Sequence, residues 1–450
     1  MGDYSEKSYQ KKLETIFTRF PSVQQLGFGE AYKPGLEHMQ EFENLLGEPH
    51  KAYRTLHVAG TNGKGSVASM LASVLSSAGL KTGLYTSPHL VDFRERMRIC
   101  PAGPGGAPGV LVPEEYVYNF LCRHEAAMDR MNLSFFEITT GMAFRWFADE
   151  KVDVAVIETG LGGRLDSTNI ILPDLSIVTT IGLDHCEQLG NTLEAIAGEK
   201  AGIFKKGVPA LVGEAVPETR PVFEAKASGL CPVVFAQDSA PSLWPRHEEI
   251  LRKMDLQGGY QRRNLRTVLA AVDLLKGMPF YAGLQDDAGV ADAIARAAAR
   301  TGFHGRWERL CEDPPVLCDI GHNPQALQEN FGQLRKMLSD GECSSLLIVY
   351  AVMADKDLDA ILPLMPEEAT YLFTSPAIPR ALPADRLAAR YKAFCRKTGR
   401  SDGRARCTAS VRDAVDMAVR LARRRGPHAL VYIGGSAYLV AEAVTCLQGF

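Results

Sequence analysis

The segment with the clearest chemical capacity runs from Leu56 to Ser66 and reads Leu-His-Val-Ala-Gly-Thr-Asn-Gly-Lys-Gly-Ser. Its glycines let the backbone turn tightly and direct N–H groups toward a common centre, while Lys64 supplies a mobile positive charge. An apolar run opens the segment, and a helix-compatible stretch from Val67 to Ala78 follows it. A strand, a glycine-rich loop and a helix in this order are typical of a site for the phosphates of a nucleoside triphosphate.

The spacing in this loop differs from the common Walker form, in which Ser or Thr follows the lysine directly. Here Gly65 separates Lys64 from Ser66. A glycine-rich turn without a ligand is therefore the alternative interpretation. The strand before the loop and the helix after it are the context that the motif requires, and they favour the phosphate site.

Further polar residues follow strand-like runs. Apolar runs alternate with helical periods from residue 56 onward, which predicts a mostly parallel sheet with helices on both faces. Ligands of such sheets bind at the carboxyl ends of the strands. The predicted strands are 56–59, 81–85, 152–157 and 175–181, and the residues that come just after them include Lys64, Ser87, Glu158 and His185.

A bound triphosphate needs Mg²⁺, which prefers hard oxygen ligands. Glu158 is the leading protein ligand because it ends an apolar strand and precedes Thr-Gly-Leu-Gly-Gly; a carboxylate that caps a turn is the alternative. His185 is a metal or phosphate contact or a hydrogen-bonded structural residue, and Ser87 lies in a Ser-Pro pair that is common in turns. Position alone would make Lys200 a solvated helix lysine.

The second half of the chain repeats the alternation, with strands expected at 316–318, 346–350, 369–374 and 429–433. After the first of them, Asn323 is expected to cap a helix that Pro324 begins. The predicted fold is α/β: a P-loop mononucleotide-binding parallel-sheet domain, residues 1–302, followed by a smaller Rossmann-like α/β domain, residues 303–450. We also expect a surface helix within residues 1–20, a helix over 260–275, helical structure over 278–300, and a surface loop at 101–109.

The length and composition of the chain agree with two ordinary globular domains. The chain has 450 residues, 46% of them hydrophobic, and a formal net charge of −3, which argues against nucleic acid or an anionic membrane as the main partner. Its ten cysteines contain no Cys-x-x-Cys pair, which fits reduced thiols. No signal-peptide pattern and no run of roughly 18 apolar residues is present, so we expect a cytoplasmic protein with small-molecule ligands.

Taken together, the motifs resemble those of the folylpolyglutamate synthase and dihydrofolate synthase group of the Mur ligase superfamily. The resemblance extends from about residue 32 to residue 443. The segments that carry it are Gly-Thr-Asn-Gly-Lys-Gly-Ser66, Tyr-Thr-Ser-Pro-His-Leu90, Glu-Thr-Gly-Leu-Gly-Gly-Arg-Leu-Asp-Ser-Thr-Asn169, Gly-Leu-Asp-His185, Gly-Glu-Lys-Ala-Gly-Ile-Phe204, His-Gly-Arg-Trp-Glu308, Asp-Ile-Gly-His-Asn-Pro324 and Gly-Gly-Ser-Ala-Tyr-Leu439.

The resemblance implies ATP-dependent amide formation between a carboxylate and the amino group of L-glutamate through an acyl phosphate. It implies both polyglutamylation of folate and synthesis of dihydrofolate from dihydropteroate, the latter because Arg164 in Gly-Gly-Arg-Leu-Asp is similar to bifunctional bacterial members. The implied cofactors are ATP and Mg²⁺, with a second Mg²⁺ held through a carbamylated Lys200 and room for a monovalent cation. The family also leans monomeric.

Residue by residue, the resemblance implies four groups of functional side chains. Catalytic residues are Lys64, Glu158, His185 and Lys200, and metal ligands are Ser87, Glu158, His185 and Lys200. Nucleotide contacts are Asn62, Gly63, Lys64, Gly65, Ser66, Asn264, Arg306, Asp319 and His322. The pteroate pocket involves Gly35, Phe136, Arg164, Asp166 and Ser167, although a buried Phe is by default a core residue.

Three alternatives remain at this level. One is a related ligase that acts on another carboxylate, such as a peptidoglycan precursor; the P-loop near residue 60 leaves little chain ahead of it for an additional uridine-nucleotide domain. Another is folylpolyglutamate synthase activity alone. The third is a P-loop switch without synthesis, which needs no second domain that supplies Arg306 and Asp319.

Overall fold

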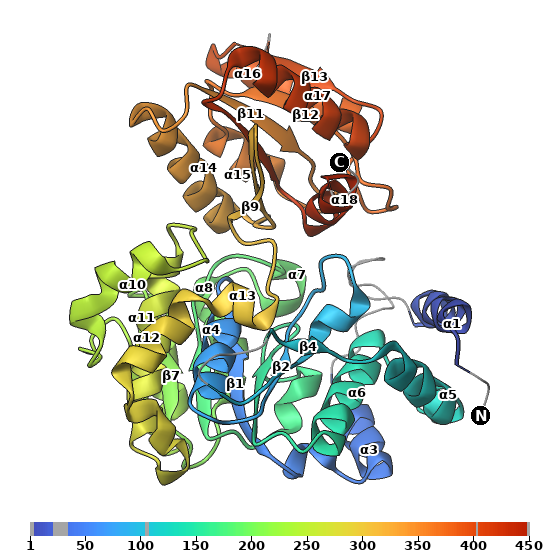
Figure 1. The fold of residues 1–450 in the computed structure, drawn as a ribbon, viewed down its shortest axis with the longest axis vertical. Helices are drawn as coiled ribbons and strands as arrows, with labels where there is room; N and C mark the ends of the chain where they lie inside the picture. Colours follow the sequence, from blue (N-terminus) through green and yellow to red (C-terminus); the bar gives the residue numbers. More distant parts are fainter. Residues whose placement is uncertain (1–3, 21–34, 104–107, 402–403, 448–450) are drawn as a thin grey trace. The chain divides into compact units, whose positions relative to one another are not determined.

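The computed structural model describes residues 4–20, 35–103, 108–401 and 404–447 (Figure 1). The chain forms two compact units, which are described separately below. The first unit comprises Met1–Asp255 and Gln261–Phe303, and the second comprises Leu256–Tyr260 and His304–Phe450. The short segment Leu256–Tyr260 thus lies with the second unit, whereas the sequence analysis placed it with the first. Residues 104–107 of the expected loop at 101–109 lie outside the described ranges.

The first unit is built on an eight-stranded sheet with the order β4-β3-β2-β5-β1-β6-β7-β8. The pairs are parallel except for those of β3 with β2 and β4, so the predicted parallel core is confirmed. The antiparallel β3–β4 pair forms one edge of the sheet. The strands are β1 (Arg54–Ala59), β2 (Thr82–Tyr85), β3 (Met97–Cys100), β4 (Val110–Leu111), β5 (Val154–Glu158), β6 (Leu175–Val178), β7 (Ala210–Val212) and β8 (Val233–Phe235).

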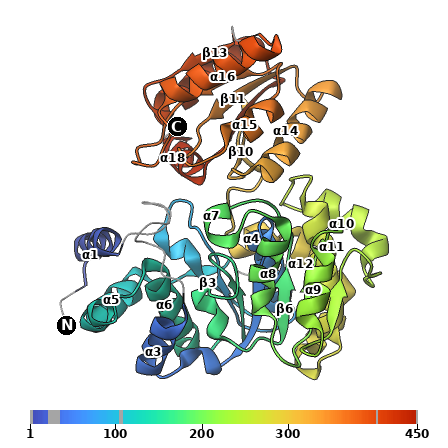
Figure 2. The same cartoon turned by 180° about the vertical axis from the view of Figure 1, so that it is seen from behind.

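Helices cover this sheet on both faces (Figures 1 and 2). They are α1 (Glu6–Arg19), α3 (Glu37–Leu46), α4 (Lys64–Ser77), α5 (Glu114–Arg130), α6 (Phe135–Asp149), α7 (Cys186–Leu189), α8 (Leu193–Lys200), α9 (Arg220–Ala227), α10 (His247–Lys253), α11 (Gln261–Lys276), α12 (Asp287–Ala295) and α13 (Ala297–Thr301). The helical stretch expected over 278–300 is divided into a 3₁₀ segment, Pro279–Gln285, and the short helices α12 and α13.

Helix α4, which follows the glycine-rich loop, is buried along almost its whole length. It packs on β1, β2 and β5 and against α11, α12 and α13. Its many Ala, Ser and Val residues suit this position because small side chains let neighbouring helices approach closely. The Ser73 hydroxyl donates a hydrogen bond to the carbonyl oxygen of Ala293, 2.7 Å away. The helix is therefore a rigid support for the loop that precedes it.

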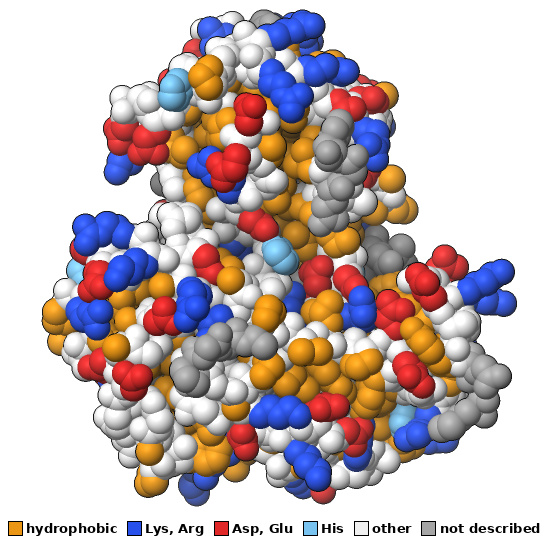
Figure 3. Space-filling model, viewed as in Figure 1, with side chains coloured by type: hydrophobic (Ala, Val, Ile, Leu, Met, Phe, Trp, Pro, Cys, Tyr) orange, Lys and Arg blue, Asp and Glu red, His pale blue; other side chains and the backbone are white. Residues whose placement is uncertain are grey.

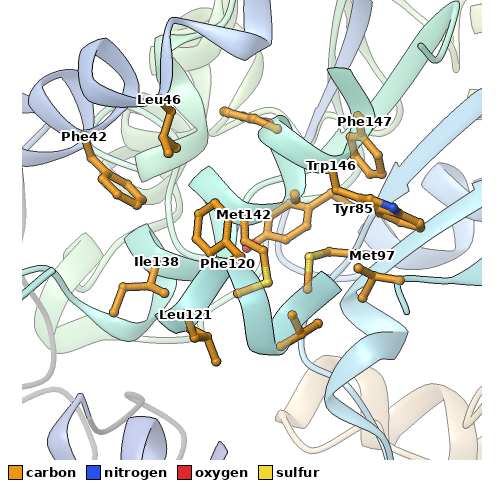
Figure 4. Packing of buried hydrophobic residues seen from close by; sticks show 14 of the residues in the cluster. Phe42, Leu46, Tyr85, Met97, Phe120, Leu121, Ile138, Met142, Trp146 and Phe147 are labelled. Carbon is orange, nitrogen blue, oxygen red and sulfur yellow. The ribbon is translucent and has the colours of Figure 1, made fainter. Parts of the chain in front are cut away.

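A separate aromatic-rich core joins α1, α3, α5 and α6 to the sheet (Figure 4). The expected N-terminal helix is confirmed as α1, and it is only partly a surface helix, since Tyr9, Leu13 and Ile16 are buried. Ion pairs from Lys12 and Arg19 to Glu125 fix α1 on α5. Buried residues of α1 and α6 thus belong to the same hydrophobic core.

The second unit has a six-stranded sheet with the order β13-β12-β11-β14-β10-β9, parallel except for β9. Asn323 caps α14 by accepting from the Ala326 amide, and Pro324 is its first residue, as predicted. The strands are β9 (Glu308–Glu312), β10 (Pro315–Asp319), β11 (Ser345–Tyr350), β12 (Thr370–Phe373), β13 (Ala405–Cys407) and β14 (Ala429–Gly434); the helices are α14 (Pro324–Ser339), α15 (Leu358–Ile361), α16 (Ala384–Thr398), α17 (Val411–Arg425) and α18 (Ala437–Leu447).

Acidic and basic side chains are interspersed over the face shown in Figure 3. Such mixing agrees with the small net charge of the chain. Within the described ranges, no helix is both long enough and apolar enough to cross a membrane.

Candidate functional site

Four adjacent parallel strands bring the predicted motifs to one edge of the first sheet. The order β2-β5-β1-β6 is continuous, and each neighbouring pair runs in the same direction. The segments that follow these strands therefore leave the sheet at the same edge. They carry the glycine-rich loop after β1, Ser87 after β2, Glu158 at the end of β5 and His185 after β6.

The glycine-rich loop has backbone angles that side chains other than glycine rarely adopt. Gly60 has φ = 149° and Gly63 has φ = 89°. A methyl group on Gly60 would lie 1.9 Å from Oγ1 of Thr179, so there is no room for a side chain at this position. The hydroxyl of Thr179 donates to the Asn62 carbonyl oxygen at 2.6 Å. These contacts hold the loop against the end of β6, and α4 begins at Lys64.

Two lysines meet at the loop. Lys64 Nζ lies 3.1 Å and Lys200 Nζ 2.8 Å from the carbonyl oxygen of Gly60. Lys200 is 4% exposed, so the position-based expectation of a solvated helix lysine is wrong. Burial, and secondly the charge of Lys64, lower the pKa of Lys200 to about 7, and Asp184 and Asp166 oppose this shift. The periodicity of α8 could not reveal this burial because it results from packing against a distant loop.

The carboxylate of Glu158 lies beside both the loop and Ser87. It is 3% exposed and accepts a hydrogen bond from the backbone N–H of Ser87 at 3.0 Å. A methyl group on Gly65 would lie 3.6 Å from Oε2 of Glu158. His185 precedes α7 with φ = 53°, and its Nε2 lies 3.8 Å from Oδ2 of Asp184. A buried carboxylate is thus placed next to the loop that would bind phosphates and beside the backbone of Ser87.

This donor set fits Mg²⁺ better than a softer metal. Magnesium uses oxygen ligands and commonly takes one or two carboxylates, with phosphates and water completing its shell. Glu158 and Ser87 offer such oxygens. Over the described ranges, no three His, Cys, Asp or Glu side chains form a cluster that could hold a metal by themselves.

Helix α11 brings Asn264 to the loop. A methyl group on Gly63 would lie 2.3 Å from Oδ1 of Asn264, which shows how closely the two residues pack. Asn264 donates through Nδ2 to Oε1 of Gln261 at 2.8 Å, and Gln261 donates through Nε2 to Oγ of Ser66 at 3.2 Å. Gln261 was not among the residues predicted from the sequence. Its spacing of three residues from Asn264, which puts both on one helix face, was the available signal.

The predicted pteroate residues surround the segment after Glu158. A methyl group on Gly160 would lie 2.5 Å from the ring of Phe136, so the backbone is pressed against this ring. The Phe136 ring also lies 6.0 Å from that of Tyr85, between centroids. Arg164 forms an exposed ion pair with Glu199 at 2.9 Å. Exposed pairs of this kind contribute little to stability, so Arg164 can exchange partners readily.

Asp166 is buried and accepts several hydrogen bonds. Thr168 donates to its Oδ1 through both its amide and its hydroxyl, and the Leu161 amide donates to Oδ2 at 2.8 Å. Burial raises the pKa of Asp166, and these donors oppose the shift. The Thr168 hydroxyl has one hydrogen, so it accepts from His57 Nε2, 2.8 Å away. His57 is therefore the neutral tautomer with hydrogen on Nε2, and burial lowers its pKa to about 3.

Ser167 and Gly35 are the other two residues predicted for the pteroate pocket. Ser167 begins the 3₁₀ segment that Asp166 caps, and it is 8% exposed. Gly35 has φ = 136°, and a methyl group there would lie 2.5 Å from Oε2 of Glu37. The backbone at Gly35 thus adopts a conformation that favours glycine.

In the second unit, Asp319 is the centre of a buried network. Its Oδ1 accepts from the Gly321 amide at 2.7 Å and from Asn330 Nδ2 at 2.8 Å. Its Oδ2 accepts from the Trp307 amide at 2.9 Å and from the Tyr260 hydroxyl at 2.6 Å. These donors use the acceptor capacity of a carboxylate, which is about four lone-pair sites. Asp319 therefore orders the protein around it.

The other two predicted residues of the second unit lie close to Asp319 in the chain. His322 Nδ1 is 3.1 Å from the Ile320 carbonyl oxygen, and Arg306 donates to the carbonyl oxygen of Gly305 at 3.2 Å. Arg306 directly precedes Trp307, whose amide is held by Asp319. The network thus fixes the backbone next to Arg306.

Comparison with known proteins assigns this architecture. The family described as "Mur ligase, glutamate ligase domain" matches residues 305–437. A Bacillus subtilis protein named dihydrofolate synthase/folylpolyglutamate synthase is 34% identical over 347 residues, which cover 72% of this chain and 76% of the relative. The chain belongs to the dihydrofolate synthase/folylpolyglutamate synthase family. It is accordingly an ATP-dependent ligase, and the P-loop switch is excluded.

Solved structures of this family share the fold over nearly the whole chain. An Escherichia coli enzyme in complex with DHPP and ADP is 27% identical, with a TM-score of 0.78 and coverage of 98% of both chains. The bifunctional folylpolyglutamate synthase/dihydrofolate synthase of Yersinia pestis, complexed with AMPPNP and a Mn ion, is also 27% identical, with a TM-score of 0.76 and coverage of 93% and 95%. Both structures contain an adenine nucleotide, and that of the Yersinia pestis enzyme also contains a Mn ion.

Proposed function

We propose that this family member adds L-glutamate both to folates and to dihydropteroate, using ATP to activate the acceptor carboxylate. The observation that carries the proposal is the meeting of the P-loop lysine, the buried Glu158 and Ser87 at one edge of the first sheet. The E. coli enzyme, which binds DHPP and ADP together, supports the inclusion of the dihydropteroate step.

The glycine-rich loop of the first unit would hold the phosphates of ATP. Residues 62–66 surround the phosphates with backbone N–H groups, and Lys64 moves from the Gly60 carbonyl to a phosphate oxygen. Asn264 contributes from α11. Arg306, Asp319 and His322 of the second unit remain proposed nucleotide contacts, and within that unit Asp319 fixes the backbone beside Arg306.

Magnesium, when bound, neutralises charge on the transferring phosphoryl group. Ser87, Glu158 and His185 would hold it, with Glu158 and Ser87 as neighbours already. Glu158 is suited to this task because its carboxylate is buried beside the loop, where a charge interacts strongly with another charge.

The chemistry requires two displacements. The acceptor carboxylate attacks the γ-phosphorus of ATP, the bond to the bridging oxygen breaks, and ADP leaves. The amino group of glutamate then attacks the acyl carbon, phosphate departs with the bonding electron pair, and the amine loses a proton. A carboxylate by itself would have to expel oxide, whereas phosphate leaves easily. The protein positions these groups and stabilises their charge.

We propose that Lys200 is carbamylated in the active enzyme. The ammonium would first lose a proton, and the neutral amine would then add to CO₂ and release a second proton, so that a carboxylate replaces a buried cation. Lys200 is buried, and its only hydrogen-bond partner within the described part of the chain is the Gly60 carbonyl. A carboxylate at this position could hold a second Mg²⁺. Mass spectrometry of the intact protein at neutral pH, with and without bicarbonate, tests for the added CO₂.

The acceptor pocket is assigned to the segment after Glu158 and to Phe136. The ring of Phe136 offers a flat apolar wall against Gly160, which suits a planar pterin. Arg164, Ser167 and the turn at Gly35 complete the proposed pocket. Asp166 shapes it from within, since its oxygens accept hydrogen bonds from the surrounding backbone.

The test is phosphate release by the purified protein with ATP, Mg²⁺ and L-glutamate, with dihydropteroate or tetrahydrofolate as acceptor. Release with both acceptors, with products one glutamate heavier, is the expected result. Release with tetrahydrofolate alone would restrict the enzyme to polyglutamylation and contradict the role given to Arg164. No release with either acceptor, in protein that binds ATP, would direct the search to another carboxylate.

A further inference from the structure

Gln261 occupies an unusual position for a glutamine. It is the first residue of α11 and the first residue of the first unit after the segment Leu256–Tyr260. Its side chain is fully buried, at 0% exposed. A buried primary amide is costly unless its donors and acceptor are satisfied. Its partners therefore indicate what the residue does.

Those partners are two residues of the proposed nucleotide site. Oε1 of Gln261 accepts from Nδ2 of Asn264 at 2.8 Å, and Nε2 of Gln261 donates to Oγ of Ser66 at 3.2 Å. Ser66 and Gln261 are 195 residues apart in sequence. The amide thus bridges the helix that follows the P-loop to the helix that carries Asn264.

The bridge fixes the orientation of both neighbours. Because Asn264 donates through Nδ2 to Gln261, its Oδ1 faces Gly63, where a methyl group would lie 2.3 Å away. Ser66 accepts from Gln261, and a hydroxyl has one hydrogen and two acceptor positions. The hydroxyl hydrogen of Ser66 and one lone pair therefore remain available to a ligand in the loop.

We infer that Gln261 is a positioning residue for nucleotide binding, which acts through the hydroxyl of Ser66 and the amide of Asn264. It does not itself need to touch the nucleotide. This inference rests on the proposed function, because it assumes that ATP and ADP bind at residues 62–66. Gln261 would thereby determine which hydrogen-bonding groups of Ser66 and Asn264 face the phosphates. Neither the P-loop nor the strand-end residues have this role.

The test measures ADP affinity by calorimetry in the full chain. Gln261→Leu removes both hydrogen bonds while keeping a similar volume, and we expect ADP to bind about fivefold to tenfold more weakly, as expected for one to two lost hydrogen bonds. The matched control is Gln237→Leu. Gln237 also uses both ends of its amide, but on the backbone of Ala215. A control variant that folds should bind ADP as the wild type does.

A double-mutant cycle separates positioning from general loss of stability. If Gln261 acts through Ser66, Gln261→Leu should weaken ADP binding much less in a Ser66→Ala background than in the wild type. Equal effects in both backgrounds, or unchanged ADP affinity in Gln261→Leu, would overturn the inference. Failure of the wild-type protein to bind ADP would instead refute the proposed nucleotide site.

Gln261→Glu is the second variant, for use where the leucine variant does not fold. Glutamate keeps the acceptor for Asn264 but cannot donate to Ser66, whose hydroxyl hydrogen would then turn toward the carboxylate. We expect weaker ADP binding than in the wild type, with the helix content unchanged. Wild-type ADP affinity in Gln261→Glu would overturn the role of the Ser66 contact.

Discussion

Lys64 and Lys200 direct their ammonium groups at the same carbonyl oxygen, that of Gly60, at 3.1 and 2.8 Å. Two like charges at one acceptor repel each other, and the charge of Lys64 is the second cause, after burial, of the low pKa of Lys200. An anionic group in the loop would attract both lysines. The arrangement therefore favours a phosphate as ligand and leaves Lys64, the less buried of the two, ready to move toward it.

The first prediction concerns Lys64. Lys64→Met should lower the rate of phosphate release on the order of 100-fold or more, since a preorganised charge on the transferring group is lost. The fold should persist because Lys64 contacts only backbone carbonyls. Lys51→Met is the control, since Lys51 is 62% exposed and pairs with Glu48. A near-normal rate in Lys64→Met would remove this lysine from the site.

The second prediction concerns Glu158. Glu158→Gln keeps an oxygen that can accept from the Ser87 amide, so the local structure should survive. The charge that Mg²⁺ requires is lost, and we expect phosphate release to fall by a similar factor. The second readout is thermal stabilisation by ADP, which should gain from Mg²⁺ in the wild type but not in the variant. Glu150→Gln, at an exposed ion pair with Lys81, should behave as the wild type.

The local structure around the glycine-rich loop could be predicted from the sequence. The strand, loop and helix around Lys64 were predicted because hydrophobic period and glycine content are local properties. The same holds for the cap at Asn323 and for α11, found over 261–276 where 260–275 was expected. The strand ends then placed Ser87, Glu158 and His185 at one edge without further information.

Features that depend on contacts between residues far apart in the chain could not be predicted from the sequence. The burial of Lys200 results from packing against Gly60, 140 residues away in sequence. The proposed role of Gln261 depends on its contact with Ser66, 195 residues away in sequence. The strands β4 and β13 are two and three residues long, too short to give a periodic pattern. The segment Leu256–Tyr260 contacts the second unit through long-range hydrogen bonds, from the Gly259 amide to Gln333 and from the Tyr260 hydroxyl to Asp319.

The third prediction is a dependence of stability on pH through His57. In the unfolded chain its pKa is the ordinary 6.5, and in the fold it is about 3. Below pH 6.5 the unfolded state therefore binds a proton that the native state does not, and the free energy of unfolding falls by about 1.4 kcal/mol per pH unit. This contribution amounts to about 2 kcal/mol between pH 6.5 and 5.

His57→Gln tests this prediction, because glutamine can donate to Thr168 as Nε2 of His57 does but does not titrate. Urea unfolding at several pH values should show a flatter curve for this variant than for the wild type between pH 5 and 6.5. His428→Gln, at an exposed position, is the control and should keep the wild-type slope. Equal slopes for His57→Gln and the wild type would show that His57 does not cause the acid sensitivity.

The fourth prediction concerns the attachment of Tyr260 to Asp319. Tyr260→Phe removes a hydrogen bond of 2.6 Å to a carboxylate, and bonds to charged groups contribute about 1.5–3 kcal/mol. We expect faster hydrogen exchange at the Trp307 amide, which donates to the same Oδ2 atom. Asp319→Asn should have a larger effect, because an amide cannot accept from all four donors.

Tyr371→Phe provides the matched control for that experiment. Its hydroxyl donates to the Pro366 carbonyl oxygen at 2.7 Å in the same unit, away from Asp319. Both tyrosine variants should lose stability toward urea, but only Tyr260→Phe should accelerate exchange at Trp307. A change at Trp307 of the same size in both variants would mean that exchange there reports global stability of the second unit. The Tyr260 contact would then be a general stabilising bond, and the fixed backbone beside Arg306 would need another explanation.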